Sequence, residues 1–235
     1  QLMDSVGIVL NIEARGSSGP SITYEVSPEN GWIMREYAKA VPYPFAHSIA
    51  YEIYKLLPND TDFSPLKEAG LSGFNIGFID DFANYHSMND TPENLNLSSL
   101  QHHGSYIMGI AQHFGNIDLT ITKAKDVVYF NWIGSSLILY PTDLNTVFVI
   151  LISILLIALI FVGLKTKRIS IGKILIGFGV YLLSLILTLF LTWLLQKAIL
   201  AIYPHYSIFY SSNFYNIKEY FFAFSCLAVA VFPLI

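Results

Sequence analysis

Two long runs without a charged residue occupy the second half of this chain and most constrain how it can fold. Val147–Leu164 is almost entirely Val, Ile, Leu, Phe and Ala, and Ile174–Gln196 is a second uncharged run. A helix rises about 1.5 Å per residue, so each run can cross, or nearly cross, a hydrocarbon core about 30 Å thick. A third apolar run begins at Tyr220. The sequence therefore predicts three transmembrane spans, at about 146–164, 174–196 and 220–235.

Charge divides the chain near residue 145. Residues 1–144 carry seven Lys and Arg against sixteen Asp and Glu, whereas residues 145–235 carry six basic residues and one acid. The acidic first part, with no basic stretch among aromatic residues, argues against a nucleic-acid partner. The single cysteine, Cys226, forms no internal disulfide. We expect a globular domain over 1–115, a connector over 116–144 and a transmembrane region over 145–235.

The loop between the first two predicted spans indicates their orientation. It contains Lys165, Lys167 and Arg168, with Lys173 close behind. Short basic loops stay on the cytoplasmic side of a membrane. The globular domain would then lie on the extracytoplasmic side, periplasmic or lumenal, with the lipid bilayer as a partner. The aromatic segment Lys197–Glu219 would return to that side, either at the headgroup level or packed on the domain.

The first part of the chain alternates short strand-like segments with helical ones, which predicts an α/β sandwich with helices on both faces of its sheet. The expected strands are Val6–Ile12, Ser21–Val26 and Gly73–Ile79. The expected helices are Asn30–Ala40, His47–Leu57 with Ser48 as a possible cap, Phe63–Ala69 stopped by Gly70, and Leu97–Phe114. Residues 116–144 suggest a strand and an amphipathic connector.

Polar residues follow two of these strands. Asn11–Gly16 follows the first strand, and Asp80–Asp90 follows the Gly73–Ile79 strand. In open α/β sheets, ligands bind at the carboxyl ends of the strands. The pattern therefore places Glu13 and His86 on one rim of the sheet, although each residue alone also has an ordinary structural interpretation.

Four stretches in this order resemble the di-zinc aminopeptidase family, and most of all its membrane-bound branch, which includes the endoplasmic reticulum metallopeptidase and the fungal vacuolar membrane protease. They read NIEARGSSGPS (11–21), LPNDTDFSPLKEAGLSGFNIGFI (57–79), YHSMNDTPENL (85–95) and SLQHHG (99–104). The connector VVYFNWIGSSLILYP (127–141) is similar as well. The resemblance covers about residues 5–141 and implies part of a zinc-exopeptidase sandwich, followed by the all-α transmembrane region.

The resemblance also implies a site with two zinc ions bridged by an Asp. Glu13 matches the acidic ligand after a strand, and His86 matches the late histidine ligand in the tyrosine–histidine motif, so the two would serve different metals. The family's remaining ligands and its general-base Glu lie upstream of Gln1, so this chain contributes no catalytic residue of its own. We therefore expect 1–235 to be an inactive fragment of a longer protein.

Other polar residues near this rim have two interpretations each. Asp90 could orient His86 or cap the following turn. Asp60 and Asp62 could line a substrate pocket, or Asp60 could cap the short helix after it. Arg15 could pair with one of these acids or hold a substrate carboxylate, and Tyr85 lies beside His86. His102 and His103 lie within a predicted helix, which favours packing over metal ligation.

The sequence thus supports two hypotheses of function. The first is a membrane-anchored zinc metallopeptidase of the aminopeptidase type, which hydrolyses the amino-terminal bonds of peptide substrates outside the cytoplasm. The second is a non-catalytic, peptidase-like binding or scaffolding module. Retention of both Glu13 and His86 favours the enzyme.

Overall fold

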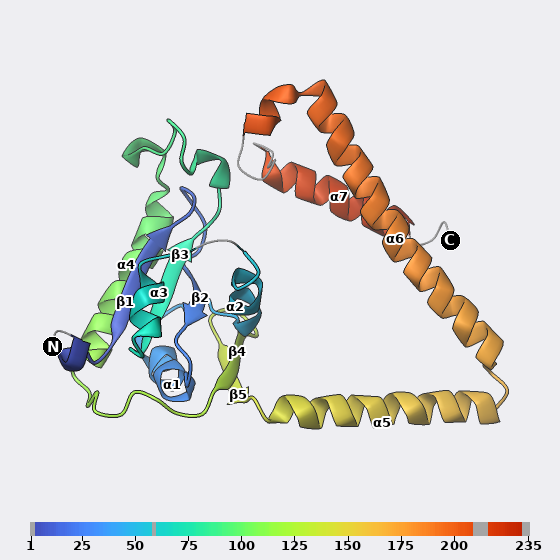
Figure 1. Ribbon diagram of the computed structural model, residues 1–235, viewed down its shortest axis with the longest axis horizontal. Helices are drawn as coiled ribbons and strands as arrows, with labels where there is room; N and C mark the ends of the chain where they lie inside the picture. Colours follow the sequence, from blue (N-terminus) through green and yellow to red (C-terminus); the bar gives the residue numbers. More distant parts are fainter. Residues whose placement is uncertain (1–2, 58–59, 209–215, 232–235) are drawn as a thin grey trace. The chain divides into compact units, whose positions relative to one another are not determined.

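The computed structural model describes residues 3–57, 60–208 and 216–231, and the chain divides into two units, 1–147 and 148–235 (Figure 1). In unit 1 the strands are β1 (Val9–Ala14), β2 (Ile22–Val26), β3 (Gly73–Phe78), β4 (Val127–Asn131) and β5 (Leu137–Pro141). Its α-helices are α1 (Gly31–Ala40), α2 (Ser48–Tyr54), α3 (Phe63–Glu68) and α4 (Leu97–Phe114). Short 3-10 turns lie at η1 (Met3–Ser5), η2 (Phe82–Asn84) and η3 (Pro92–Asn94).

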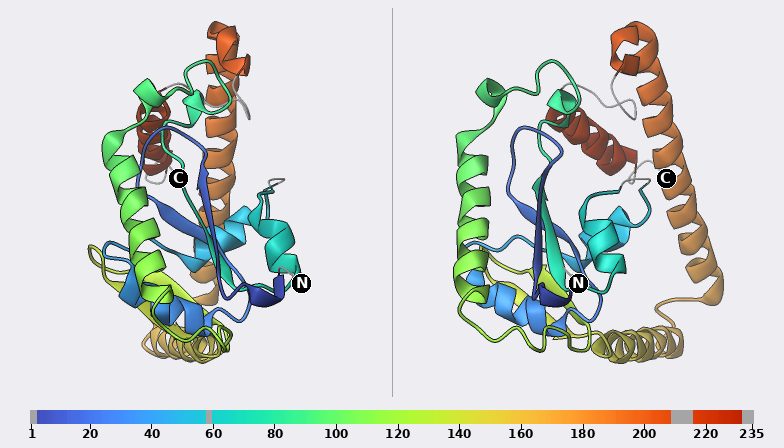
Figure 2. Two further views of the ribbon diagram at one scale, coloured as in Figure 1. Left: turned by 90° about the vertical axis from the view of Figure 1, so that its left-hand side faces the viewer. Right: turned by 60° about the vertical axis from the view of Figure 1, so that its left-hand side comes forward.

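The sheet that positions the candidate site has the strand order β1-β3-β2. β1 runs parallel to β3, with Val9 opposite Gly73 and Ala14 opposite Phe78, whereas β2 is antiparallel to β3. Helix α4 covers one face of this sheet, and α2 and α3 lie on the other (Figure 2). The predicted α/β sandwich with helices on both faces is confirmed.

The two faces of the sheet differ in chemistry. Phe74 and Ile76 of β3 are fully buried and pack with Tyr37 of α1 and with Tyr106 and Phe114 of α4. Alternate residues of a strand point to opposite faces, so Asn11 and Glu13 of β1 and Asn75 of β3 belong to the other face. One face therefore forms the hydrophobic core, and the other carries polar groups.

Helix α4 forms over the predicted range because its capping and its apolar stripe agree. The side chain of Asn96 accepts a hydrogen bond from the Ser99 backbone N–H, which satisfies a free donor of the first turn. The buried side chains recur at helical spacing along one stripe, at Ser99, His103, Tyr106, Ile110 and Phe114.

Helix α2 is shorter than predicted, and the predicted role of Ser48 is wrong. The helix ends at Tyr54, and His47 rather than Ser48 precedes it, without a side-chain cap. Oγ of Ser48 instead accepts a hydrogen bond from the Tyr129 backbone N–H at 2.8 Å. Ser48 therefore satisfies a donor on β4 and ties α2 to that strand.

Residues 116–144 also differ from expectation. They contain two strands where one was expected, because β4 pairs antiparallel with β5 from Val127 opposite Pro141 to Asn131 opposite Leu137. Asn131 accepts a hydrogen bond from the Ala46 backbone N–H at 2.8 Å. The hairpin thus packs with the core of the first unit through Val127 and Tyr129.

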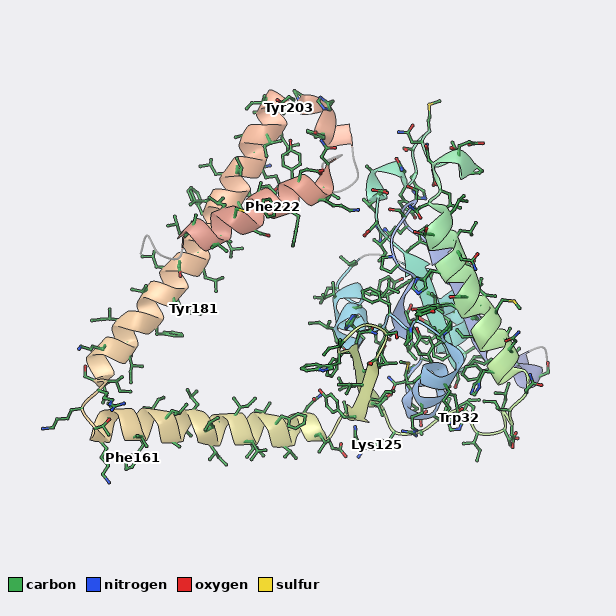
Figure 3. The ribbon with its side chains drawn as sticks, turned by 180° about the vertical axis from the view of Figure 1, so that it is seen from behind. Trp32, Lys125, Phe161, Tyr181, Tyr203 and Phe222 are labelled. Atoms are coloured by element: carbon green, nitrogen blue, oxygen red, sulfur yellow. The ribbon has the colours of Figure 1, made fainter. Side chains whose placement is uncertain are left out.

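The described residues of unit 2 form helices. They are α5 (Leu144–Lys165), α6 (Ile171–Ile202), the 3-10 turn η4 (Pro204–Ile208) and α7 (Ile217–Val231). The first of them, α5, begins in unit 1, but most of its length belongs to unit 2. Both α5 and α6 are long and apolar enough to cross a membrane. Apolar side chains project on all sides of α5, Phe161 among them (Figure 3). A helix that is apolar on all sides belongs either in a protein core or in a membrane. The apolar side chains of α5 are exposed, so it is not a core helix of the described structure.

Helix α6 continues past the predicted end of its span. Lys197, expected to open a loop, lies within the helix, which ends at Ile202. Its 32 residues rise about 48 Å, more than the thickness of a hydrocarbon core, so the helix can extend beyond the lipid. Tyr206 packs with Ile199 near its end. The other expected aromatic positions, 209–215, and the end of the third predicted span, 232–235, lie outside the described residues.

Candidate functional site

The loops that follow β1 and β3 are hydrogen-bonded to each other at one rim of the sheet. The backbone N–H groups of Ser17 and Ser18 both donate to the carbonyl of Asp80 at 3.1 Å, and the Asp80 N–H donates to the Ser18 carbonyl at 3.0 Å. Oγ of Ser18 donates to the carboxylate of Asp81, and the Asn84 amide donates to Ser17 Oγ at 2.6 Å. The loop after β1, which Glu13 precedes, and the loop after β3, which carries His86, are therefore held together at this rim.

Glu13 lies near the carboxyl end of β1, opposite Gly77 of β3. Its side chain is half-buried, and Oε1 accepts a hydrogen bond from Nδ2 of Asn11 at 3.2 Å. The backbones of Glu13 and Gly77 approach closely here: a Cβ at position 77 would lie 3.1 Å from the Glu13 carbonyl oxygen and 3.3 Å from the Tyr24 ring. The position combines a fixed strand backbone with a carboxylate that keeps free acceptor capacity.

His86 lies in the loop after η2, and its backbone is unusual. Its φ is 54°, in the left-handed region that side chains other than glycine adopt rarely. Its exposed ring stacks on Tyr85 with centroids 3.8 Å apart and planes 18° from parallel. Such backbone strain, of order 1–3 kcal/mol, persists only where the surroundings enforce it and is concentrated at functional sites.

Arg15 connects the Glu13 strand with the His86 loop. Its backbone N–H donates to the Phe78 carbonyl at 2.9 Å. Its guanidinium lies 5.3 Å from the ring centroid of Phe82 and 5.7 Å from that of Tyr85, within the range of cation–π attraction. The structure thus places the Arg15 guanidinium over the ring of Tyr85, and this ring stacks on His86.

The donor chemistry of Glu13 and His86 suits zinc, which binds carboxylate oxygen and imidazole nitrogen. Two donors are fewer than the four that a structural zinc site usually has. Among the residues that the structure describes, no three His, Cys, Asp or Glu side chains form a group that could hold a metal ion. The assignment of both residues as zinc ligands therefore stays a prediction.

Asp60 and Asp62 lie directly before α3. Oδ1 of Asp60 accepts a hydrogen bond from the Thr61 backbone N–H at 2.9 Å, and hydrogen bonds from Ser64 and Thr61 lower the pKa of this exposed carboxyl. Asp62 occupies the N-cap position of α3 without a side-chain cap bond. Asp62 rather than Asp60 is thus the N-cap residue of α3, since Asp60 bonds to Thr61, which lies before the helix; a role of either residue in a substrate pocket stays a prediction.

Asp90 lies in the exposed part of the loop after β3. Its backbone N–H donates to the Ser87 carbonyl at 3.1 Å, which closes a tight turn. Within the described loop, the structure records no hydrogen bond between the Asp90 carboxylate and His86. The orienting role predicted for Asp90 is therefore still a prediction.

A buried polar network on the sheet face of Glu13 escaped sequence reasoning. Asn75 of β3 is fully buried, and its amide nitrogen donates to Oε2 of Glu25 and to Oγ1 of Thr61, both at 2.8 Å. Its Oδ1 accepts from Nδ2 of Asn11 at 2.9 Å and from the Tyr24 hydroxyl at 2.7 Å. The only signal in the sequence was the single polar residue within the apolar strand GFNIGFI.

A β-bulge and an ion pair complete this network. The register of β2 shifts between Thr23 and Glu25, and a bulge sets two residues against one of the partner strand, so Tyr24 and Glu25 both reach Asn75. Nζ of Lys67 donates to Oε1 of the buried Glu25 at 2.5 Å. Burial alone lowers the pKa of Lys67, but the hydrogen bond and the charge of Glu25 outweigh it and raise that pKa.

Two histidines of α4 hold the loop after β1 and are structural, as their position in a helix indicates. Nε2 of His102 lies 3.0 Å from the Tyr43 carbonyl, which only accepts, so this nitrogen carries the proton. Nδ1 of the same ring then accepts from the Ser21 backbone N–H at 3.1 Å. Nδ1 of His103 lies 2.7 Å from Ser21 Oγ, and burial, with the neighbouring His102 as the second cause, lowers the pKa of His103.

The comparison with protein families gives one match. Residues 1–111 match the sequence pattern described as Peptidase family M28. No solved structure is significantly similar to the chain.

Curated relatives are named as an endoplasmic reticulum metallopeptidase or as a vacuolar membrane protease. The chain is 29% identical to human "Endoplasmic reticulum metallopeptidase 1" over 145 residues, which cover 59% of this chain and 16% of that protein. It is 31% identical to the "Vacuolar membrane protease" of Candida dubliniensis over 173 residues, which cover 71% of this chain and 18% of that protein. The chain thus spans about a sixth of the length of these relatives. The resemblance to the membrane-bound branch is confirmed.

Proposed function

We propose, on the premise that residues 1–111 are part of a Peptidase family M28 domain, that this chain is a section of a membrane-anchored zinc metallopeptidase of the aminopeptidase type. The observation that carries the proposal is the pairing of the two loops after β1 and β3. A carboxylate and an imidazole, the two donor types that zinc prefers, lie on strands and loops held together by backbone hydrogen bonds. Two zinc ions, peptide substrates and the lipid bilayer are the implied partners.

The residues of this chain would bind the metal ions and orient their ligands. Glu13 and His86 would each contribute one ligand to a different metal, while the Arg15, Phe82 and Tyr85 contacts hold the His86 loop against the end of β1. Paired zinc ions would supply a hydroxide at neutral pH and polarise the peptide carbonyl. The general base and the other ligands would come from the rest of the protein, so residues 1–235 alone would not catalyse hydrolysis.

The membrane part of the proposal rests on α5 and α6. Their apolar length and the basic loop between them favour two membrane spans with Lys165–Arg168 in the cytoplasm and unit 1 on the extracytoplasmic side, periplasmic or lumenal. The test is labelling by a membrane-impermeant maleimide in sealed vesicles, with Cys226→Ser as background. Cysteine at exposed Gln101 and cysteine at Thr166 should react on opposite sides, and labelling of both from one side would contradict this topology.

Activity is tested on the full-length protein that contains this chain. We expect about two zinc ions per molecule and release of amino-terminal residues from peptides. Glu13→Gln and His86→Gln should each lower zinc content and abolish hydrolysis. The matched controls Glu52→Gln and His113→Gln, whose side chains pair with Lys55 and Glu36, should leave both unchanged.

The alternative, a non-catalytic binding module, predicts a different result from the same samples. A full-length protein that is folded and free of zinc, and that does not hydrolyse peptides even with added zinc, would refute the enzyme and favour the module. Release of internal peptide fragments instead of amino-terminal residues would refute the aminopeptidase type alone.

A further inference from the structure

The buried network of Glu25, Lys67, Asn75 and Asn11 ends on the carboxylate predicted to bind zinc. Each link is within hydrogen-bond distance: Lys67 Nζ to Glu25 Oε1 is 2.5 Å, Asn75 Nδ2 to Glu25 Oε2 is 2.8 Å, and Asn11 Nδ2 to Asn75 Oδ1 is 2.9 Å. Nδ2 of Asn11 also donates to Glu13 Oε1 at 3.2 Å. One chain of hydrogen bonds therefore links an ion pair beneath the sheet to the rim.

The Lys67–Glu25 ion pair determines the donor and the acceptor in every hydrogen bond of this series. A lysine only donates and an ionised carboxylate only accepts, so Glu25 must accept from both Lys67 and Asn75. The Asn75 amide nitrogen therefore faces Glu25, and its oxygen faces Asn11. Asn11 must then present its own nitrogen to Asn75, and this same nitrogen is the one beside Glu13. An amide alone can turn either way, but here the ion pair excludes the other orientation.

We propose that the Glu25–Lys67 pair acts through Asn75 and Asn11 to hold a hydrogen-bond donor against Glu13, which makes these residues positioning residues for the zinc ligand. The inference rests on the proposed function. Metal-binding carboxylates are usually oriented by hydrogen bonds from a neighbouring shell, and loss of such a partner weakens metal binding about 10- to 100-fold. The residues do not touch the metal themselves.

The geometry gives a sharp test, because one substitution far from Glu13 should reverse the donor–acceptor direction of these hydrogen bonds. In Glu25→Gln, Lys67 still requires an oxygen, so the new amide nitrogen faces Asn75. Asn75 must turn its oxygen toward position 25, and Asn11 must turn its oxygen toward Asn75 and therefore toward Glu13. An acceptor then faces the Glu13 carboxylate, which should turn the ligand away from its position.

A second substitution should restore the original direction. In the double variant Glu25→Gln/Asn75→Asp, the amide at position 25 donates to the carboxylate at position 75, and this carboxylate accepts from Asn11 as before. The double variant has the same net charge as the parent protein. Asn11→Ala tests the other end, since it removes the donor beside Glu13 and leaves the Glu25–Lys67–Asn75 contacts in place.

The experiment measures the zinc dissociation constant of the full-length protein by competition with a chromophoric chelator, together with the unfolding temperature of the zinc-free form. Glu25→Gln and Asn11→Ala should raise the dissociation constant about 10- to 100-fold, and the double variant should restore it to within about threefold of the parent. The matched control is Glu52→Gln, an exposed ion-paired glutamate, which should change nothing.

Each result decides between positioning and mere stability. A folded Glu25→Gln variant with the parent's dissociation constant overturns the proposal, as does a double variant that regains the unfolding temperature but not the zinc affinity. If Glu25→Gln does not fold, an unchanged dissociation constant in Asn11→Ala overturns it. A parent protein that binds no zinc overturns the proposed function and this inference together, whereas a zinc-binding parent with insensitive variants overturns this inference alone.

Discussion

Gly16→Ala should separate the two loops that form the candidate site. A Cβ at position 16 would lie 2.1 Å from the Asp80 carbonyl oxygen and 2.9 Å from that of Ile79, so the Asp80 oxygen must retreat by about 0.9 Å to reach even 3.0 Å. That retreat strains the three backbone hydrogen bonds between Asp80 and Ser17 and Ser18. At about 0.5–1.5 kcal/mol each, their loss would lower the free energy of unfolding by about 2–4 kcal/mol.

The assay is urea unfolding of the chain in mild detergent, with tryptophan fluorescence as the signal that monitors unfolding. Gly104→Ala is the matched control, since a Cβ there meets no atom within 4 Å and lies within α4. Alanine in a helix interior is favoured over glycine, so this control should gain about 0.5–1 kcal/mol. If Gly16→Ala is as stable as the parent, the loops are not held by the contact described, and the reasoning about the rim is wrong.

Two further predictions follow from buried side chains, and a third follows from the number of zinc donors in this chain. Burial lowers the pKa of His103, so on acidification the unfolded chain takes up a proton at this residue before the folded chain does. The free energy of unfolding should therefore fall as the pH drops from about 6.5 through the folded-state pKa. Urea unfolding at pH 7.5 and 5.5 checks this, and His103→Gln should reduce the difference between the two values. Lys67→Met leaves Glu25 buried without its cation and should cost about 2–4 kcal/mol in urea unfolding, most of which Glu25→Gln in the same chain should recover. Residues 1–235 alone should bind no zinc tightly in equilibrium dialysis, because two donors do not fill a zinc site; one tightly bound zinc per chain would contradict this.

Regular segments with agreeing local signals were predictable. The range of α4 came out as Leu97–Phe114, because its cap and its apolar spacing indicate the same ends. Gly70, with φ at 85°, ends the α3 segment as expected, since glycine adopts this conformation at little cost. The first strand was predicted at Val6–Ile12, but β1 is Val9–Ala14, because an apolar run does not mark where pairing with a neighbouring strand begins or ends.

Features that depend on distant partners were not predictable. The β4–β5 hairpin formed where a connector was expected, since Leu137–Pro141 needs Val127–Asn131 as its pairing strand. Ser48 bonds to Tyr129 instead of capping its own helix. The polar network around Asn75 joins residues from four separate segments of the chain, and no local pattern announces it.

The sequence by itself determined the apolar runs of α5 and α6 and the order of the elements from β1 to α4, with Glu13 near the end of β1 and His86 in the loop after β3. These features are local: they depend on hydrophobic periodicity, charge and turn residues along one stretch of chain. Only the tertiary structure decided which way β2 runs, which face of the sheet is polar, and how Arg15 and Asn11 reach the candidate ligands. Those outcomes depend on side chains far apart in sequence, because a buried amide or cation must find its partner wherever the fold provides one.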